Sequence, residues 1–290
     1  MTEINCVLDA KASIGENPVW SIEEQSLYWL DTTRRAIHRF NPKSKVNRTW
    51  TMPDLVCSFA LRKNGGLIVA LGAGIFLIDL ETMSINTIDK EVTDKTQTRL
   101  NDGRCDRAGR FWVGAMDLDK HRKIASLYRV DPDLSIHKVI DELIVSNGLA
   151  WSPDGNTMYH SDSRQNIIWA YDYDLETGVP GNRRVFAATN PEEGLPDGAA
   201  VDVEGFYWSA GVRGGRVIRY TPDGHIDRVI KLPVSLPSMC AFGGENLDIL
   251  FITSAREFLS ESELLKEPLA GGIFAIDAGV KGVPEPYFMG

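Results

Sequence analysis

The sequence predicts an all-β protein: a six-bladed β-propeller with four antiparallel strands in each blade. One pattern recurs six times, and we call the first residue of each copy its anchor: Glu16, Cys57, Asn101, Asn147, Asp197 and Ser238. The anchors are separated by 41, 44, 46, 50 and 41 residues, a period typical of propeller blades. Short period-2 strand patterns bounded by Gly, Asn, Asp and Pro fill each copy. Helical character is confined to residues 260–266, SESELLK, which are predicted to form one short turn.

Each copy follows the same order of elements. The anchor opens a first strand, and a turn follows eight residues after the anchor, occupied in order by Glu24, Gly65, Gly109, Gly155, Gly205 and Asn246. An aromatic or β-branched second strand comes next, then a third strand such as AIHRF from Ala36, and then a weaker fourth strand. The segment INCVLDAK, residues 4–11, precedes the first anchor and is predicted to supply the outer strand of the last blade. The copies use the whole chain, so we predict a single domain over residues 1–290.

Composition narrows the classes of partner. The chain has 290 residues, of which 43% are hydrophobic and 24% charged, and this is typical of a globular protein. Its formal net charge is −9, from 31 Lys and Arg against 40 Asp and Glu, and no basic run interrupts the acidic background. Nucleic acids and anionic membranes require a cationic face. We therefore expect neither as a partner, and the charge favours cations or neutral small molecules.

No leader or membrane segment is expected from the sequence. The first twenty residues have no charged segment followed by an apolar one, and the apolar stretches are too short for a membrane span. The four cysteines are far apart and form no CxxC pair, a pattern that indicates reduced thiols. These observations predict a soluble cytoplasmic protein. The sequence leaves its oligomeric state open, a monomer included.

The anchor positions are the candidate functional residues. In a propeller the first strand of each blade lines the central channel, so equivalent side chains converge near the axis. Five of the six anchors carry side-chain oxygens, and two are carboxylates, which would repel one another without a cation. Oxygen ligands without His or Cys favour Ca²⁺, Mg²⁺ or Mn²⁺ over Zn²⁺. The alternative is that Asn and Asp stand at strand starts because they favour turns, and the repeat alone does not decide which anchors bind.

Other catalytic patterns are missing from the sequence. There is no GxSxG nucleophile motif, no P-loop, and no GxGxxG after a strand. His160 lies within a predicted strand between Tyr159 and Ser161, and we interpret it as a structural residue rather than a catalytic one.

Several segments spread over the chain carry a family resemblance. They are GENPVW from Gly15, RLNDGRCDRAGRFWVGAMD from Arg99, SNGLAWSPDGNTMYHSDS from Ser146, PDGAAVDVEG from Pro196, CAFGGENLDILFITSA from Cys240 and PLAGGIFAID from Pro268. As a set they resemble the six-bladed sugar-lactonase family that includes regucalcin (senescence marker protein), gluconolactonases and xylonolactonases.

The resemblance implies a divalent metal held by Glu16, Asn147 and Asp197. It also implies that Asp197 acts as the general base and that Arg99 and Asn101 hold substrate hydroxyls. A further acidic contact falls on Asp119, where the family often has the longer Glu. Two other positions depart from the family, since many relatives have an aromatic residue or Thr in place of His160, and bacterial relatives often have Trp in place of Arg213.

The resemblance therefore implies a metal-dependent hydrolase that opens a sugar lactone, of the pentonolactone or gluconolactone type, to its aldonic acid. The metal could be Ca²⁺, Mn²⁺, Mg²⁺, Fe²⁺ or Zn²⁺, because oxygen ligands accept all of them. Two alternatives remain: a hydrolase of a non-sugar lactone, ester or organophosphate, and a non-catalytic calcium-binding propeller.

Overall fold

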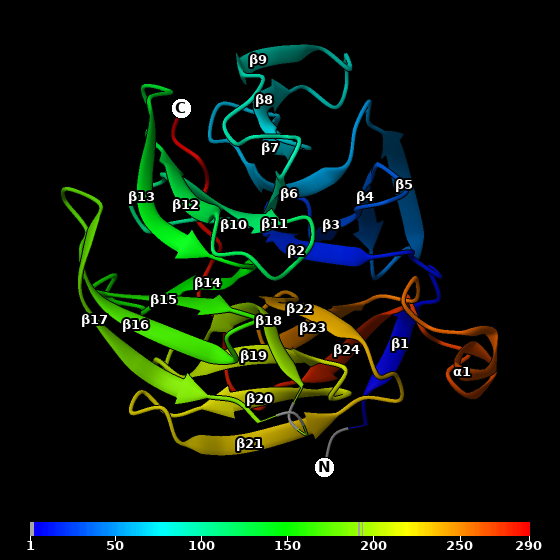
Figure 1. Cartoon of the computed structure of the whole chain (residues 1–290). Helices are drawn as coiled ribbons and strands as arrows, with labels where there is room; N and C mark the ends of the chain where they lie inside the picture. The colour runs from blue at the N-terminus through cyan, green and yellow to red at the C-terminus, as the bar shows by residue number, and fades with distance from the viewer. Residues whose placement is uncertain (1–2, 191, 193) are drawn as a thin grey trace. The chain divides into compact units, whose positions relative to one another are not determined.

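Six four-stranded antiparallel sheets make up a computed structural model that describes residues 3–190, 192 and 194–290. The fold class is the predicted six-bladed β-propeller, with one sheet in each blade (Figure 1). The described residues form two compact units, unit 1 within Met1–Pro53 and Thr189–Glu285, and unit 2 within Asp54–Ala188 and Pro286–Gly290. The expectation of a single domain stays a prediction.

Unit 1 holds the first, fifth and sixth blades. Their strands, in the order in which they pair, are β2 (Gly15–Ser21), β3 (Ser26–Asp31), β4 (Ala36–Asn41) and β5 (Val46–Thr51); β18 (Leu195–Val201), β19 (Tyr207–Val212), β20 (Arg216–Tyr220) and β21 (Ile226–Lys231); and β22 (Pro237–Gly243), β23 (Ile249–Ser254), β24 (Ile273–Asp277) and β1 (Asn5–Leu8). The last pairing confirms that the N-terminal segment supplies the outer strand of the last blade, where Figure 1 shows β1 beside β24.

Unit 2 holds the second, third and fourth blades. Their strands are β6 (Val56–Leu61), β7 (Leu67–Leu71), β8 (Gly74–Ile78) and β9 (Ile85–Asp89); β10 (Thr98–Cys105), β11 (Phe111–Asp117), β12 (Ala125–Val130) and β13 (Ile136–Leu143); and β14 (Ser146–Trp151), β15 (Thr157–Asp162), β16 (Ile167–Asp174) and β17 (Val179–Ala188). Phe288, two residues before the end of the sequence, also belongs here and is fully buried in the apolar core of this unit.

The first strand of each blade contacts the first strands of its neighbours within the unit. In unit 1, β22 contacts both β2 and β18, and in unit 2, β10 contacts both β6 and β14. The predicted turns after these strands are also present. The four glycines at anchor plus eight have positive φ, from 74° to 87°, a conformation that a side chain disfavours. The recurrence of glycine at this position therefore follows from the turn.

A buried aspartate closes the turn after the first strand in two blades. Asp202 accepts backbone bonds from Glu204 and Phe206 at 3.0 and 3.1 Å and a bond from Trp208 Nε1 at 2.8 Å. The carboxylate of Asp202 also pairs with Arg219, which is 5% exposed and whose Nη2 lies 2.7 Å from Asp202 Oδ2. One carboxylate thus ties a turn, a tryptophan and an arginine together.

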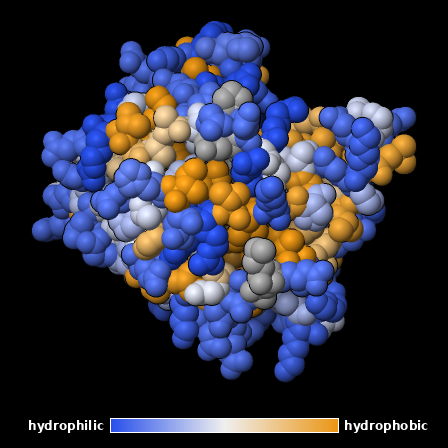
Figure 2. All heavy atoms as spheres, turned by 90° about the horizontal axis from the view of Figure 1, so that it is seen from below, coloured by the Kyte–Doolittle hydropathy of each residue, from blue (hydrophilic) through white to orange (hydrophobic). Residues whose placement is uncertain are grey.

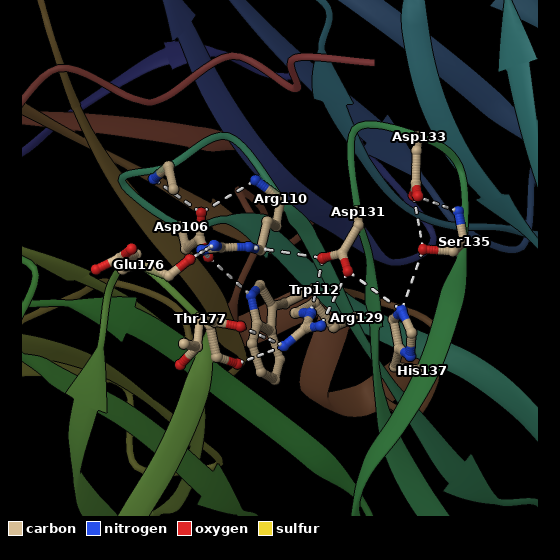
Figure 3. Close-up of polar contacts among 12 residues, drawn as sticks. Asp106, Arg110, Trp112, Arg129, Asp131, Asp133, Ser135, His137, Glu176 and Thr177 are labelled. Atoms are coloured by element: carbon tan, nitrogen blue, oxygen red, sulfur yellow. Dashed lines mark hydrogen bonds and ion pairs between the residues drawn. The ribbon is translucent and has the colours of Figure 1, made fainter.

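Unit 2 repeats this arrangement around Asp106 (Figure 3). Asp106 accepts from the backbone of Ala108 and Arg110 at 2.9 and 3.0 Å and from Trp112 Nε1 at 3.3 Å. The Arg110 side chain lies 3.0 Å from Asp106 and 3.6 Å from Asp131. Because both blades use the aspartate five residues after the anchor, the repeat extends to the side chains that fix the turns.

The predicted short helix is also present. Helix α1 (Glu261–Lys266) is capped by Ser260, whose side chain accepts from the Glu263 backbone while the Glu263 side chain accepts from the Ser260 backbone, a capping box. No described helix is long and apolar enough to cross a membrane. Hydrophilic residues cover most of the face drawn in Figure 2, and apolar residues are exposed among them.

Candidate functional site

The pairing of first and second strands changes register at the anchor in every blade. The shifts fall between Glu16 and Val19, Val56 and Ser58, Leu100 and Gly103, Asn147 and Ala150, Pro196 and Ala199, and Pro237 and Cys240. A β-bulge at such a position bends the strand and re-aims one side chain. The anchors are therefore distinguished from ordinary strand residues by the backbone itself.

Three of the four predicted site residues in unit 2 form one hydrogen-bonded relay, Arg99–Asn101–Asn147. Arg99 Nη1 donates to Asn101 Oδ1 at 3.1 Å, and Asn101 Nδ2 donates to Asn147 Oδ1 at 2.9 Å. The Asn147 amide is held from its other side, where Nδ2 donates to Ser163 Oγ at 2.8 Å. The structure thus brings together three of the six predicted site residues and fixes the orientation of both amides.

The relay limits what Asn101 can offer a ligand. Its Nδ2 also donates to the Ser146 carbonyl at 3.0 Å, so both amide hydrogens are used within the unit. Its oxygen, which already accepts from Arg99, has one more lone pair with which to accept from a substrate hydroxyl. Asn101 therefore holds Asn147 as a donor and can act toward a ligand as an acceptor; its predicted contact with substrate stays a prediction.

Arg99 differs from Asn101 in that it can offer a ligand hydrogen-bond donors rather than an acceptor. Within the described residues its guanidinium contacts are all made by Nη1, which also donates to the Leu100 carbonyl at 2.8 Å and to Cys57 Sγ at 3.8 Å. Nε and Nη2 are thus able to donate to a ligand, and the predicted contact of Arg99 with a substrate stays a prediction. Burial raises the pKa of the Cys57 thiol, so the thiol stays protonated beside this arginine.

Unit 1 holds the two predicted carboxylate ligands. Glu16 and Asp197 are both half-buried, at the register shifts of β2 and β18. The strand β22 contacts both of those strands, and its anchor Ser238 is buried, with Oγ bonded to the Gly15 carbonyl and to Thr253 Oγ1. Glu16 and Asp197 therefore lie at the register shifts of the two strands that β22 contacts.

Two buried aspartates hold the backbone that leads into the predicted ligands. Asp31 accepts from the backbone nitrogens of residues 13 and 14, three and two positions before Glu16, at 2.9 and 3.2 Å. Asp162 accepts from residues 144 and 145, three and two positions before Asn147, at 2.8 and 3.3 Å. Our sequence reasoning missed both, although each lies fifteen residues after its anchor. That shared spacing in the repeat is the signal that could have found them.

Asp119 is set apart from the relay. Its side chain is 71% exposed and lies 3.2 Å from Arg122 Nη2. The same nitrogen is 2.6 Å from Asp117, and bonds from Arg122 hold the pKa of Asp117 below its usual range. The predicted contact of Asp119 with a substrate stays a prediction.

The chemistry of the donor set fits a hard cation. Among the described residues, His, Cys, Asp and Glu side chains form no group of three that could hold a metal ion. The predicted set does not require one, because its third member is an amide. Asn147, 5% exposed, has its nitrogen engaged by Ser163 and its oxygen left with a second lone pair, as expected of an oriented ligand. Glu16 and Asp197 belong to unit 1 and Asn147 to unit 2, so their joining in one site stays a prediction.

Comparison with known proteins decides the family. The family model described as SMP-30/Gluconolactonase/LRE-like region matches residues 14–256. The chain belongs to this family. The resemblance found in the sequence is thereby confirmed, and the chain is a member of the sugar-lactonase family.

Relatives match over nearly the whole length. The chain is 42% identical over 288 residues to a protein of Pseudomonas putida named 6-deoxy-6-sulfogluconolactonase, with 99% of both chains covered. It is 40% identical over 294 residues to regucalcin of Oryctolagus cuniculus, covering 98% of this chain and 97% of the relative. A solved structure of a calcium-binding protein, regucalcin from Agrobacterium tumefaciens, has a TM-score of 0.94 at 27% identity, covering 99% of this chain and 97% of that one.

Proposed function

We propose that this protein is a metal-dependent hydrolase that opens a sugar lactone to the corresponding aldonic acid. The observation that carries the proposal is the relay of unit 2, which joins the predicted substrate-binding residues Arg99 and Asn101 to the predicted metal ligand Asn147. Family membership supports it, as does the name of the Pseudomonas putida relative, which is that of a lactonase.

In this proposal Glu16, Asn147 and Asp197 would hold one divalent cation. When bound, such a cation polarises the lactone carbonyl and stabilises negative charge on its oxygen. The ligands are all oxygens, and one solved regucalcin is described as a calcium-binding protein. Calcium is therefore the first metal to test, with Mn²⁺, Mg²⁺, Fe²⁺ and Zn²⁺ as the other candidates.

The protein's own groups orient the substrate and move the proton. Arg99 donates to sugar oxygens through Nε and Nη2, and Asn101 Oδ1 accepts from a sugar hydroxyl, so the two recognise neighbouring oxygens of opposite hydrogen-bonding role. Asp197 accepts a proton from the attacking water. The bond from the water oxygen to the carbonyl carbon forms and the bond from that carbon to the ring oxygen breaks. The ring oxygen then takes up the proton that Asp197 accepted and becomes a hydroxyl, so Asp197 returns to its carboxylate form. The product is an open-chain hydroxy acid, which releases a proton at neutral pH.

A pH-indicator assay of the purified chain tests the proposal. The panel contains pentonolactones, gluconolactone and 6-deoxy-6-sulfogluconolactone, the last suggested by the name of the Pseudomonas putida relative. An aryl ester and a phosphotriester represent the alternative of a non-sugar substrate. We expect acid release from at least one sugar lactone, and loss of that rate after treatment with a chelator.

Each contrary result has a separate meaning. Hydrolysis of only the aryl ester or phosphotriester would replace the sugar by another substrate class. The chain could also bind calcium and yet hydrolyse none of the compounds, whichever of the five metals is supplied. That result would contradict the proposed activity and favour the non-catalytic calcium-binding alternative.

A further inference from the structure

A buried serine–histidine pair lies next to the relay of unit 2. Ser146 Oγ and His160 Nε2 are 2.7 Å apart, and both side chains are fully buried. Ser146 is the first residue of β14, and His160 lies on the neighbouring strand β15. The proposed function assigns a role to neither.

The Ser146 side chain has little room to move. A Cβ atom placed on Gly114 of β11 would overlap Ser146 Oγ, so the serine packs directly against the bare backbone of that strand. His160 holds the same oxygen from β15. The serine is therefore fixed by two strands at once, one from its own blade and one from the preceding blade.

The position of Ser146 sets the geometry of the relay. Its carbonyl oxygen accepts from Asn101 Nδ2 at 3.0 Å, and the same nitrogen donates at 2.9 Å to Oδ1 of the next residue, Asn147. A displacement of Ser146 thus alters both acceptors of the Asn101 amide together.

We propose that the Ser146–His160 pair positions Asn101 and Asn147, so that His160 is a positioning residue for the ligand-binding relay. This inference rests on the proposed function, in which those two asparagines meet substrate and metal. His160 acts only through Ser146 and touches neither relay amide in any described contact. Groups that orient metal ligands from behind change metal affinity when they are removed, although they bind no metal themselves.

Three variants of the full-length chain isolate the pair. His160→Phe keeps a ring of similar size and removes the nitrogen that holds Ser146, Ser146→Ala removes the hydroxyl, and the third variant combines both changes. His38→Phe is the matched control, because His38 is also a strand histidine that bonds a hydroxyl, Thr49 Oγ1 at 2.9 Å. Burial lowers the pKa of both His38 and His160 to about 4, so both are neutral at pH 7, and His38 lies on β4 of unit 1.

Three measurements are made on each variant: two report on the relay and one reports on the stability of the fold. Calorimetry of metal-stripped protein titrated with calcium measures metal affinity, NMR of the side-chain amides of Asn101 and Asn147 measures their surroundings, and urea unfolding measures stability. We expect His160→Phe and Ser146→Ala each to weaken calcium binding by about tenfold and to shift both amide signals. The double variant is expected to show no further loss, since the two side chains act as one unit. His38→Phe is expected to leave affinity and both amide signals unchanged.

If His160→Phe leaves the calcium affinity and both amide signals unchanged, the inference is overturned. A loss of stability in that variant, equal to that in His38→Phe, would not rescue it, because it would show only a structural role. Additive losses in the double variant would overturn it too, because the residues would then act separately. If the wild-type chain binds no calcium and hydrolyses no lactone, the proposed function fails, and the amide signals of the variants still decide whether the pair positions the relay.

Discussion

Replacing Asp197 with alanine is expected to abolish lactone hydrolysis while leaving the fold intact. The substitution removes both a carboxylate ligand and the proton acceptor, and loss of the base alone is expected to cost about 10²–10⁴-fold in kcat. Asp197 is half-buried at the register shift of β18, outside the two buried aspartate clusters that close the turns. Initial rates in the pH-indicator assay measure the loss, and far-ultraviolet circular dichroism checks the β-rich fold.

Two further variants separate the roles of this residue. Asp197→Asn keeps an oxygen of similar position but accepts no proton, so we expect measurable metal binding with hydrolysis still reduced at least a hundredfold. Asp223→Ala removes an exposed carboxylate from a turn of the same blade and is expected to retain the wild-type rate. Hydrolysis that survives in Asp197→Ala at a comparable rate would show that the site is wrongly assigned.

The largest loss of stability is expected from Asp202→Ala. Asp202 is fully buried and accepts bonds from two backbone nitrogens, Trp208 and Arg219. Without the carboxylate, the 5% exposed Arg219 keeps only part of its ion pairing. Removal of one partner from a buried ion pair costs about 3–5 kcal/mol, and we expect the free energy of unfolding in urea to fall by that amount.

Glu204→Ala is the control for that measurement. Glu204 contacts the same guanidinium, with its carboxylate 2.6 Å from Arg219 Nη2, but its side chain is 57% exposed. Exposed ion pairs contribute about 0–1 kcal/mol, so the two variants should differ clearly. Equal losses from both would mean that burial of Asp202 does not set its contribution to stability.

The sequence was sufficient for the fold because each blade repeats the same local signals. The glycine at anchor plus eight marks a turn with positive φ, and the segment of residues 4–11 contains a strand that precedes the first copy and pairs with β24 of the last blade. Both features depend on short stretches of chain. They are therefore visible in a comparison of one copy with the next.

The candidate site was predicted only in part, since its contacts join side chains from different strands and blades. The anchor comparison gave five oxygen-bearing residues, among them Glu16, Asn147 and Asp197, and the family resemblance selected these three as ligands. Neither carries information on hydrogen-bond direction. That both hydrogens of Asn101 are used inside the unit follows only from coordinates. His160, interpreted from sequence as structural, contacts Ser146 across a strand pair that no local pattern reveals.

The central claim is that Glu16, Asn147 and Asp197 hold one metal ion on which hydrolysis depends. Titration of metal-stripped protein with calcium, followed simultaneously by calorimetry and by the rate of lactone hydrolysis, tests it most directly. We predict that binding and activity rise together and saturate at one ion per chain, and that Glu16→Gln, Asn147→Ala and Asp197→Asn each weaken both. Full activity in the stripped protein, unchanged by calcium or by any of the other four metals, would contradict the claim.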